Sequence, residues 1–156
     1  MVLFFHSVSN SFGGVIIDGI SAQFAIIPQN SKDSIIIPNM DSVSISDTII
    51  QYIGDSLKWI HTIWNGKRLQ NGISYYGFSF IESREIVKFK SIIKQWVELF
   101  CLSPDEFYLT GEFLPDEERY DNILVKRDEL IKNLNACIDI CNKAINEGAK
   151  ILHNGI

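Results

Sequence analysis

The middle third of the chain decides the fold. Residues 72–121 read GISYYGFSFI over 72–81, ESREIVKFKSIIKQWVELFCLS over 82–103 and PDEFYLTGEFLPDEERYD over 104–121. An alternating, aromatic-rich segment is followed by an amphipathic segment, and then by a second β-prone segment with an acidic end. This order predicts a strand, a helix, a second strand and an acidic loop.

Residues 72–81 have the two-residue period of a strand. Aromatic rings occur on both sets of alternate positions, which predicts a central strand that is covered on both faces. One set consists of Ile73, Tyr75, Ser79 and Ile81, and the other of Tyr76, Phe78 and Phe80.

The next segment has an apolar stripe at three- and four-residue steps, which predicts a helix. Ser83 is its expected N-cap, and Ser103-Pro104 ends it because the residue before a proline avoids the helical conformation. Trp96 is expected to be largely buried. The stripe consists of Ile86, Phe89, Ile92, Ile93, Trp96, Val97 and Phe100.

The carboxyl-terminal third continues with further elements. A strand is predicted over 107–113, an acidic loop over 114–122, and a helix over 125–147 with Gly148 as its left-handed cap. The tail AKILHNGI, residues 149–156, is expected to add a short strand.

The amino-terminal part predicts an antiparallel meander and then a helix. Apolar residues at helical spacing predict the helix over 46–64, with Ser46 as N-cap and Asn65-Gly66 as its stop. The strands of the meander are short apolar runs between glycines and prolines. They are expected at 2–8, 15–17, 23–27 and 34–37.

Together these elements predict one α+β domain over residues 1–156, with a mostly antiparallel sheet packed against about three helices. The sheet is expected to combine the amino-terminal strands with 73–81 and 107–113. The chain has 156 residues, of which 46% are hydrophobic, and this is enough to bury a core.

Several features indicate a cytoplasmic protein without membrane contact. No segment approaches the roughly 18 apolar residues of a membrane helix, and the start MVLFFHSVSNSF lacks the basic region of a signal peptide. Cys101, Cys137 and Cys141 have no metal-site spacing and are interpreted as reduced core residues. The formal net charge of −5 argues against direct binding of nucleic acid.

The sequence contains no catalytic, cofactor-binding or metal-binding motif. Each histidine is isolated in its segment, so a structural or surface position is the favoured interpretation. We therefore expect no enzymatic activity, no cofactor and no metal. An enzyme would need a site assembled from distant groups, for which the candidates are His6, Asp18, His61 and Glu112.

Negative charge is concentrated in residues 103–129. This stretch has nine acidic and three basic residues, a net charge of −6, so the rest of the chain sums to about +1. One interpretation is a solvated loop, and the other is a docking surface for a basic partner, with aromatic anchors. The residues expected to contact the partner are Asp105, Glu106, Glu112, Asp116, Glu117, Glu118, Tyr120 and Asp121.

A succession of segments over residues 72–156 carries a resemblance. They are ISYYGFSFI, a helix ending in W-x-x-L-F, SPDEFYLTGEF, LNACIDICNKAINEG and the final ILHNGI. This succession resembles small immunity proteins of bacterial polymorphic toxin and contact-dependent growth inhibition systems. The resemblance implies a cytoplasmic protein that binds one cognate toxin domain and blocks it. Such toxins are often nucleases with basic clefts, which an acidic surface complements.

Two alternative functions stay open from the residues. One is a different binding protein, such as an accessory factor of a phage or mobile element. The other is a small enzyme with an unrecognised site, which a deep pocket with convergent titratable groups would favour. A neighbouring gene for a large secreted toxin would favour the immunity function.

Overall fold

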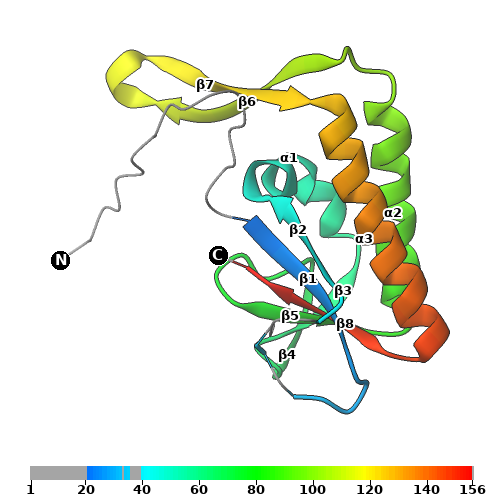
Figure 1. Cartoon of the computed structure of the whole chain (residues 1–156). Helices are drawn as coiled ribbons and strands as arrows, with labels where there is room; N and C mark the ends of the chain where they lie inside the picture. Colours follow the sequence, from blue (N-terminus) through cyan, green and yellow to red (C-terminus); the bar gives the residue numbers. More distant parts are fainter. Residues whose placement is uncertain (1–20, 33, 36–39, 156) are drawn as a thin grey trace.

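The computed structural model describes residues 21–32, 34–35 and 40–155. These residues form an α+β fold, as predicted, with a six-stranded antiparallel sheet, a separate two-stranded sheet and three α-helices (Figure 1). In chain order the elements are β1 (Ser21–Ile27), β2 (Ser42–Ser46), α1 (Asp47–Leu57), β3 (His61–Trp64), β4 (Arg68–Asn71), β5 (Phe78–Ile81), α2 (Arg84–Phe100), β6 (Glu106–Leu114), the 3-10 turn η1 (Pro115–Glu117), β7 (Arg119–Lys126), α3 (Arg127–Glu147) and β8 (Lys150–Asn154).

The large sheet has the strand order β2-β1-β8-β5-β3-β4, and each neighbouring pair is antiparallel. The carboxyl-terminal strand β8 pairs with both β1 and β5, so the tail predicted as a short strand lies in the middle of the sheet. Its residues Ile151 and Leu152 are fully buried. The strand predicted at 23–27 is confirmed as part of β1.

The main core lies between this sheet and the helices, of which α2 and α3 run side by side (Figure 1). Phe89 of α2 stacks on Phe24 of β1, with ring centroids 5.4 Å apart, and both rings are fully buried. Leu134 and Cys137 of α3 are buried in the same core. The stripe predicted for α2 therefore faces the core, with Trp96 and Val97 partly buried at its margin.

Trp96 is partly buried and packs against the main core, as its place in the predicted stripe requires. It lies where α2 meets α1, and its indole N–H donates a hydrogen bond to the Ser56 hydroxyl at 2.9 Å. Its ring contacts that of Tyr52, with centroids 5.8 Å apart. The position at the margin of the core lets the polar indole nitrogen find a partner.

The helix predicted over 46–64 is wrong beyond Leu57. The chain turns there and forms β3, which pairs with β4 and β5. Asn65 and Gly66 are not a helix cap but the turn of the β3–β4 hairpin, with φ values of +50° and +67°. The amide of Lys67 closes this turn on the carbonyl of Trp64 at 3.0 Å. An Asn-Gly pair suits both structures, because each requires positive φ.

Two predicted strands are also shorter or absent in the structure. The strand at 72–81 is central, as predicted, but only Phe78–Ile81 pairs in the sheet. Residues 73–77 form a loop before the paired part, and Gly72 at its start has φ +77° and donates its amide to the carbonyl of Ile60. The predicted strands at 2–8 and 15–17 lie outside the described residues. Of 34–37, the described residues 34–35 are not in a strand.

The segment 107–113 is a strand, as predicted, but it does not join the large sheet. As part of β6 it pairs with β7, and this pair forms the separate two-stranded sheet. The predicted acidic loop at 114–122 consists instead of a short turn and the first half of β7. The last helix accordingly begins at Arg127 rather than 125, and Gly148 caps it with φ +61°, as predicted.

Among the described residues, no helix is both long and apolar enough to cross a membrane.

Replacing Phe89 by Ala is expected to destabilise the protein by about 3–5 kcal/mol, because it leaves a cavity in the core where α2 meets β1. The measurement is chemical denaturation of the purified variant. Val87→Ala is the matched control, since Val87 is on the same helix and 48% exposed. Equal stability of the two variants would contradict the packing described for α2.

Candidate protein-binding arm

Strands β6 and β7 form a long hairpin that projects from the ends of α2 and α3 (Figure 1). Residues 105–126 are called the arm below. The hairpin brings together all the residues that the sequence predicts as partner contacts. They are Asp105 at its base, Glu106 and Glu112 on β6, Asp116 and Glu117 in the turn, Glu118 after it, and Tyr120 and Asp121 on β7.

The register of the arm separates an inner from an outer face, because opposed residues in antiparallel strands share a face. Two inner pairs near the base are Phe107 with Val125 and Leu109 with Ile123. The inner face packs towards the main core, where Leu109 is buried at 5% exposure. A bulge between Thr110 and Phe113 changes the register farther out.

Aromatic stacking attaches the inner face to the body. The ring of Phe107 stacks on that of Phe100 at the end of α2, with centroids 5.9 Å apart and planes at 23°. The Phe100 ring in turn contacts Trp96 at 5.6 Å and Tyr52 of α1 at 6.2 Å. This cluster therefore joins β6 to two helices at the base of the arm.

A single guanidinium also holds the base of the arm. Arg127, the first residue of α3, forms a salt bridge with Asp105 at 2.7 Å and donates to the carbonyl of Ser103 at 3.0 Å. Its backbone amide donates to the carbonyl of Asp105 at 2.9 Å. The chain entering the arm is thus fastened to the residue that follows it.

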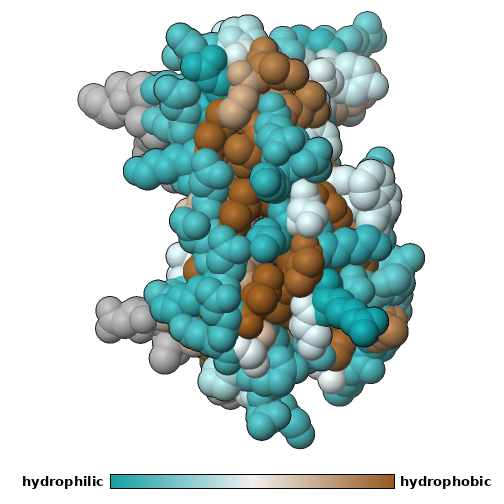
Figure 2. Space-filling view, turned by 90° about the vertical axis from the view of Figure 1, so that its right-hand side faces the viewer, coloured by the Kyte–Doolittle hydropathy of each residue, from teal (hydrophilic) through white to brown (hydrophobic). Residues whose placement is uncertain are grey.

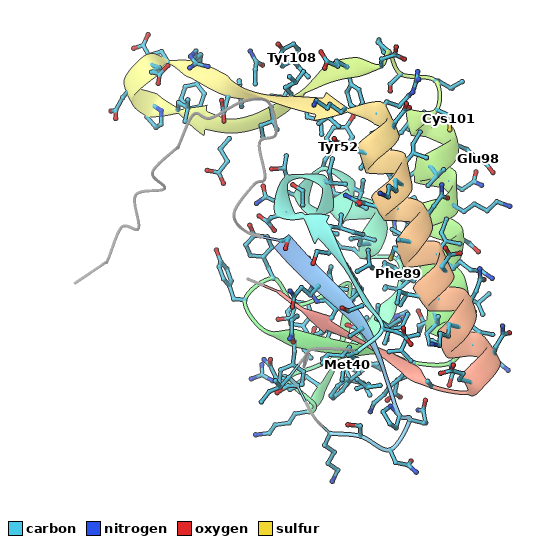
Figure 3. The ribbon with its side chains drawn as sticks, in the orientation of Figure 1. Met40, Tyr52, Phe89, Glu98, Cys101 and Tyr108 are labelled. Atoms are coloured by element: carbon cyan, nitrogen blue, oxygen red, sulfur yellow. The ribbon has the colours of Figure 1, made fainter. Side chains whose placement is uncertain are left out.

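The outer face presents aromatic rings to solvent. Tyr108 is 67% exposed, and the opposed residues Phe113 and Tyr120 are 50% and 58% exposed. Tyr108 lies on the side of the arm away from the body, whereas Tyr52 lies beneath the arm (Figure 3). Since the inner face makes the contacts with the body, the outer rings are free to meet a partner.

The arm also has a net negative charge as large as that of the whole chain. Residues 105–126 contain seven acidic and two basic residues, a net charge of −5, which equals the formal net charge of the whole chain. Six of the seven acidic residues are exposed, and Asp121 is half-buried. Arg119 forms a salt bridge with Glu117 at 2.6 Å. In the described part of the chain, no salt bridge involves Glu112, Asp116 or Glu118.

A second apolar surface runs as a strip down the face formed by α2 and α3 (Figure 2). Exposed apolar residues on these two helices include Val87, Leu99 and Ile145. The exposed charged residues of the same helices have both signs, for example Lys94 and Asp139. This face therefore lacks the single sign of charge that distinguishes the arm.

The groups considered for an enzyme do not form a common site in the described structure. His61 is exposed on β3, with Nδ1 3.9 Å from the carboxylate of Glu85. Glu112 is on the arm, and His6 and Asp18 lie outside the described residues. Within the ranges described above, no group of three or more His, Cys, Asp or Glu residues is arranged to hold a metal ion.

A buried polar group that the sequence did not single out lies under α1. His153 of β8 is 1% exposed, and its ring is 4.9 Å from that of Phe24. Among the residues that the structure describes, neither ring nitrogen has a hydrogen-bond partner. Burial lowers the pKa of His153 to about 4. It lines a small cavity with Asp47 and Tyr75. The predicted structural interpretation of this histidine agrees with its burial.

Asp47 and Tyr75 form a hydrogen-bonded network beside this cavity. The Tyr75 hydroxyl donates to the Asp47 carboxylate at 2.7 Å, and the Gln51 amide donates to Asp47 at 2.8 Å and to the Tyr75 hydroxyl. Burial and the hydrogen bond to Asp47 raise the pKa of Tyr75 to about 12. The phenol therefore stays protonated and ties the loop before β5 to the first turn of α1.

The cysteines divide into two kinds. Cys137 and Cys141 are free, fully buried thiols, as predicted for core residues of α3. Their mutual hydrogen bond and burial raise the pKa of Cys137 well above its ordinary value. Cys101 is free and exposed, which corrects the prediction of a core position. It follows the last residue of α2, where the buried stripe has ended.

Comparison of this chain with protein-family models, with curated proteins and with solved structures gives no match.

The burial of His153 predicts a loss of stability in mild acid. The unfolded state takes up a proton near pH 6.5 and the folded state only near pH 4, so stability is greatest above pH 6.5 and falls below it. Between pH 7 and 5 the loss is about 2 kcal/mol for this pKa difference. Denaturation curves at both pH values measure it.

His153→Phe is the matched variant for this pH effect, because a phenyl ring fills similar space and has no nitrogen to leave unpaired. We expect it to retain stability at pH 7 and to lose less stability than the parent at pH 5. An equal acid loss in the two proteins would contradict the assignment to His153.

Thiol labelling under native conditions is expected to modify Cys101 first. Cys137 and Cys141 are buried and the raised pKa of Cys137 keeps it as the unreactive thiol, whereas Cys101 is exposed. Mass spectrometry of the alkylated protein counts and locates the labels. Equal labelling of all three cysteines in the folded protein would show that the core opens readily around α3.

Proposed function

We propose that this protein is an immunity protein, which binds a cognate toxin domain through the arm and neutralises it. The observation that carries the proposal is the combination of exposed aromatic rings and concentrated negative charge on one projecting hairpin. The resemblance over residues 72–156 gives the biological role. The charge of the arm indicates that the toxin domain presents a basic surface, as a nuclease does around its substrate cleft.

The two kinds of side chain on the arm support different steps of binding. Exposed carboxylates attract a basic partner over a distance and accelerate the encounter. Exposed rings such as Tyr108 and Tyr120 then contribute affinity when the partner covers them, because aromatic residues are enriched among the residues that dominate binding energy. A separate catalytic centre is not needed, since covering the toxin's cleft is sufficient to block it.

The inner face of the arm supports the proposal in a third way. An isolated two-stranded hairpin is marginally stable in water. Contacts of Phe107 with Phe100 and of Arg127 with Asp105 hold this hairpin against the body. The partner therefore meets a surface whose position is set before binding, which lowers the entropy cost of association. The cytoplasm is the proposed compartment, where an immunity protein meets an incoming toxin.

Reversing Asp116, Glu117 and Glu118 to Lys is expected to slow association with the partner by roughly tenfold at low salt. The partner is first identified by co-purification from the native host, and rates are then measured across a salt series. The parent's rate should fall as salt rises, because the screening length shortens to about 8 Å at 0.15 M. The variant should depend less on salt.

A matched control reverses three exposed acidic residues outside the arm, Glu98, Asp139 and Glu147, and changes the net charge equally. This control should associate nearly as fast as the parent and melt at a similar temperature. Protection of cells that produce the toxin is the functional readout. Full protection and unchanged association by the arm variant would contradict the arm as the binding surface.

Tyr120→Ala is expected to act on dissociation rather than on association. Removing a ring that the partner covers costs roughly 1–2 kcal/mol of binding energy, mostly as a faster dissociation rate. Tyr76→Ala is the control, since Tyr76 is 85% exposed and lies outside the arm. Equal effects of the two substitutions would show that Tyr120 is not a binding anchor.

A further inference from the structure

The outer end of the arm carries an aromatic pair with a defined geometry. Phe113 and Tyr120 are directly opposed across the two strands. Their rings meet edge to face, with centroids 5.2 Å apart and planes at 63°. In the described part of the chain these rings contact no other aromatic ring. Because an edge-to-face pair leaves at least one ring face uncovered, the pair presents an open π surface, in agreement with its half-exposed rings.

Exposed carboxylates lie beside this pair at the turn that joins the two strands. Asp116 is in the turn and Glu118 follows it, two residues before Tyr120, and both are exposed. Glu112 and Asp121 are next to Phe113 and Tyr120 in the chain, so the alternation of a strand directs their side chains to the other face. The arm's own guanidinium is already engaged, because Arg119 binds Glu117 at 2.6 Å. Arg119 is next to Tyr120 in the strand, so its side chain leaves from the opposite face. The outer face at the pair is therefore not filled by a cation of the arm.

We propose that the Phe113–Tyr120 pair and the carboxylates around it form a subsite for an arginine side chain of the partner. This inference rests on the proposed function, since it assumes a basic protein partner. A guanidinium is planar, so it stacks on an aromatic face while its N–H groups bind a carboxylate in the ring plane. A lysine ammonium is a compact, strongly hydrated charge, so it is less able to contact a ring face and a carboxylate at the same time.

Other occupants fit this surface less well. A second copy of the chain would bring another arm of charge −5 against the first, and a nucleic acid would bring phosphates. A purely apolar partner would cover the rings but would also remove water from the flanking carboxylates without replacing it, which is costly. An arginine-rich surface can both stack on the aromatic rings and form ion pairs with the carboxylates.

The subsite can be tested on the full chain with two synthetic probes, an oligo-arginine and an oligo-lysine peptide of equal length and charge. Binding is followed by NMR shifts of the labelled protein across a salt series. We expect the arginine peptide to bind about threefold more tightly, as one exposed cation–π contact allows. Its largest shifts should fall on residues 111–121.

Replacing Phe113 and Tyr120 together by Leu should remove the preference for arginine and leave the affinity for oligo-lysine within about twofold, because the charge of the arm is unchanged. Tyr120→Phe keeps the π surface and should keep the preference. Tyr108→Leu is the matched control on the same face and should also keep it, which shows that the arm remains folded. Melting curves check each variant.

Equal affinity for the two peptides in the parent would overturn the subsite, as would a preference that survives the double Leu variant. Its failure can be told apart from failure of the proposed function. Capture of a toxin domain by a protein without arginine preference would reject the subsite alone. Arginine preference in a protein that protects against no toxin would reject the immunity function and support the subsite.

Discussion

The stack of Phe107 on Phe100 is the contact on which the arrangement of this protein depends. A two-stranded hairpin has little core of its own, and this one extends from the base formed by α2 and α3. The Phe107 ring continues the aromatic row of Tyr52, Trp96 and Phe100, so the inner face of the arm becomes an extension of the main core. The inner face makes the contacts that hold the arm to the body, so the outer face stays exposed and is available to bind another molecule.

The two sheets have different roles. The large sheet buries its helix-facing side, and β8, the last described strand, lies in its middle between β1 and β5. Its buried His153, which has no hydrogen-bond partner among the described residues, makes the core sensitive to acid. The small sheet bears the net charge of the chain. Stability is thus concentrated in one part of the molecule and the proposed binding surface in another.

The separation also explains why strong charge is tolerated on the arm. Seven acidic residues on one hairpin repel one another, yet most are exposed to water, where this repulsion is weak. At the base of the arm, Asp105 pairs with the guanidinium of Arg127, and the half-buried Asp121 accepts a hydrogen bond from the amide of Asn122 at 2.9 Å. None of the seven acidic residues is fully buried.

The sequence by itself determined features that depend on neighbouring residues. The periods of α2 and α3, the cap at Gly148, the β character of 107–113 and the concentration of acidic residues were all predicted from local patterns. The predicted partner residues therefore all fall in one segment of the chain. The first half of β7 was nevertheless interpreted as a loop, because its charges and the tight turn before it resemble solvent-exposed coil.

Only the tertiary structure decided which strands pair and which faces are covered. Asn65-Gly66 has the positive φ of a helix cap and of a hairpin turn, and only pairing of β3 with β4 and β5 selects the hairpin. Likewise, nothing local shows that β6 leaves the large sheet while β8 enters its middle. Strand pairing joins residues far apart in the chain, so its energy depends on partners that a local pattern does not contain.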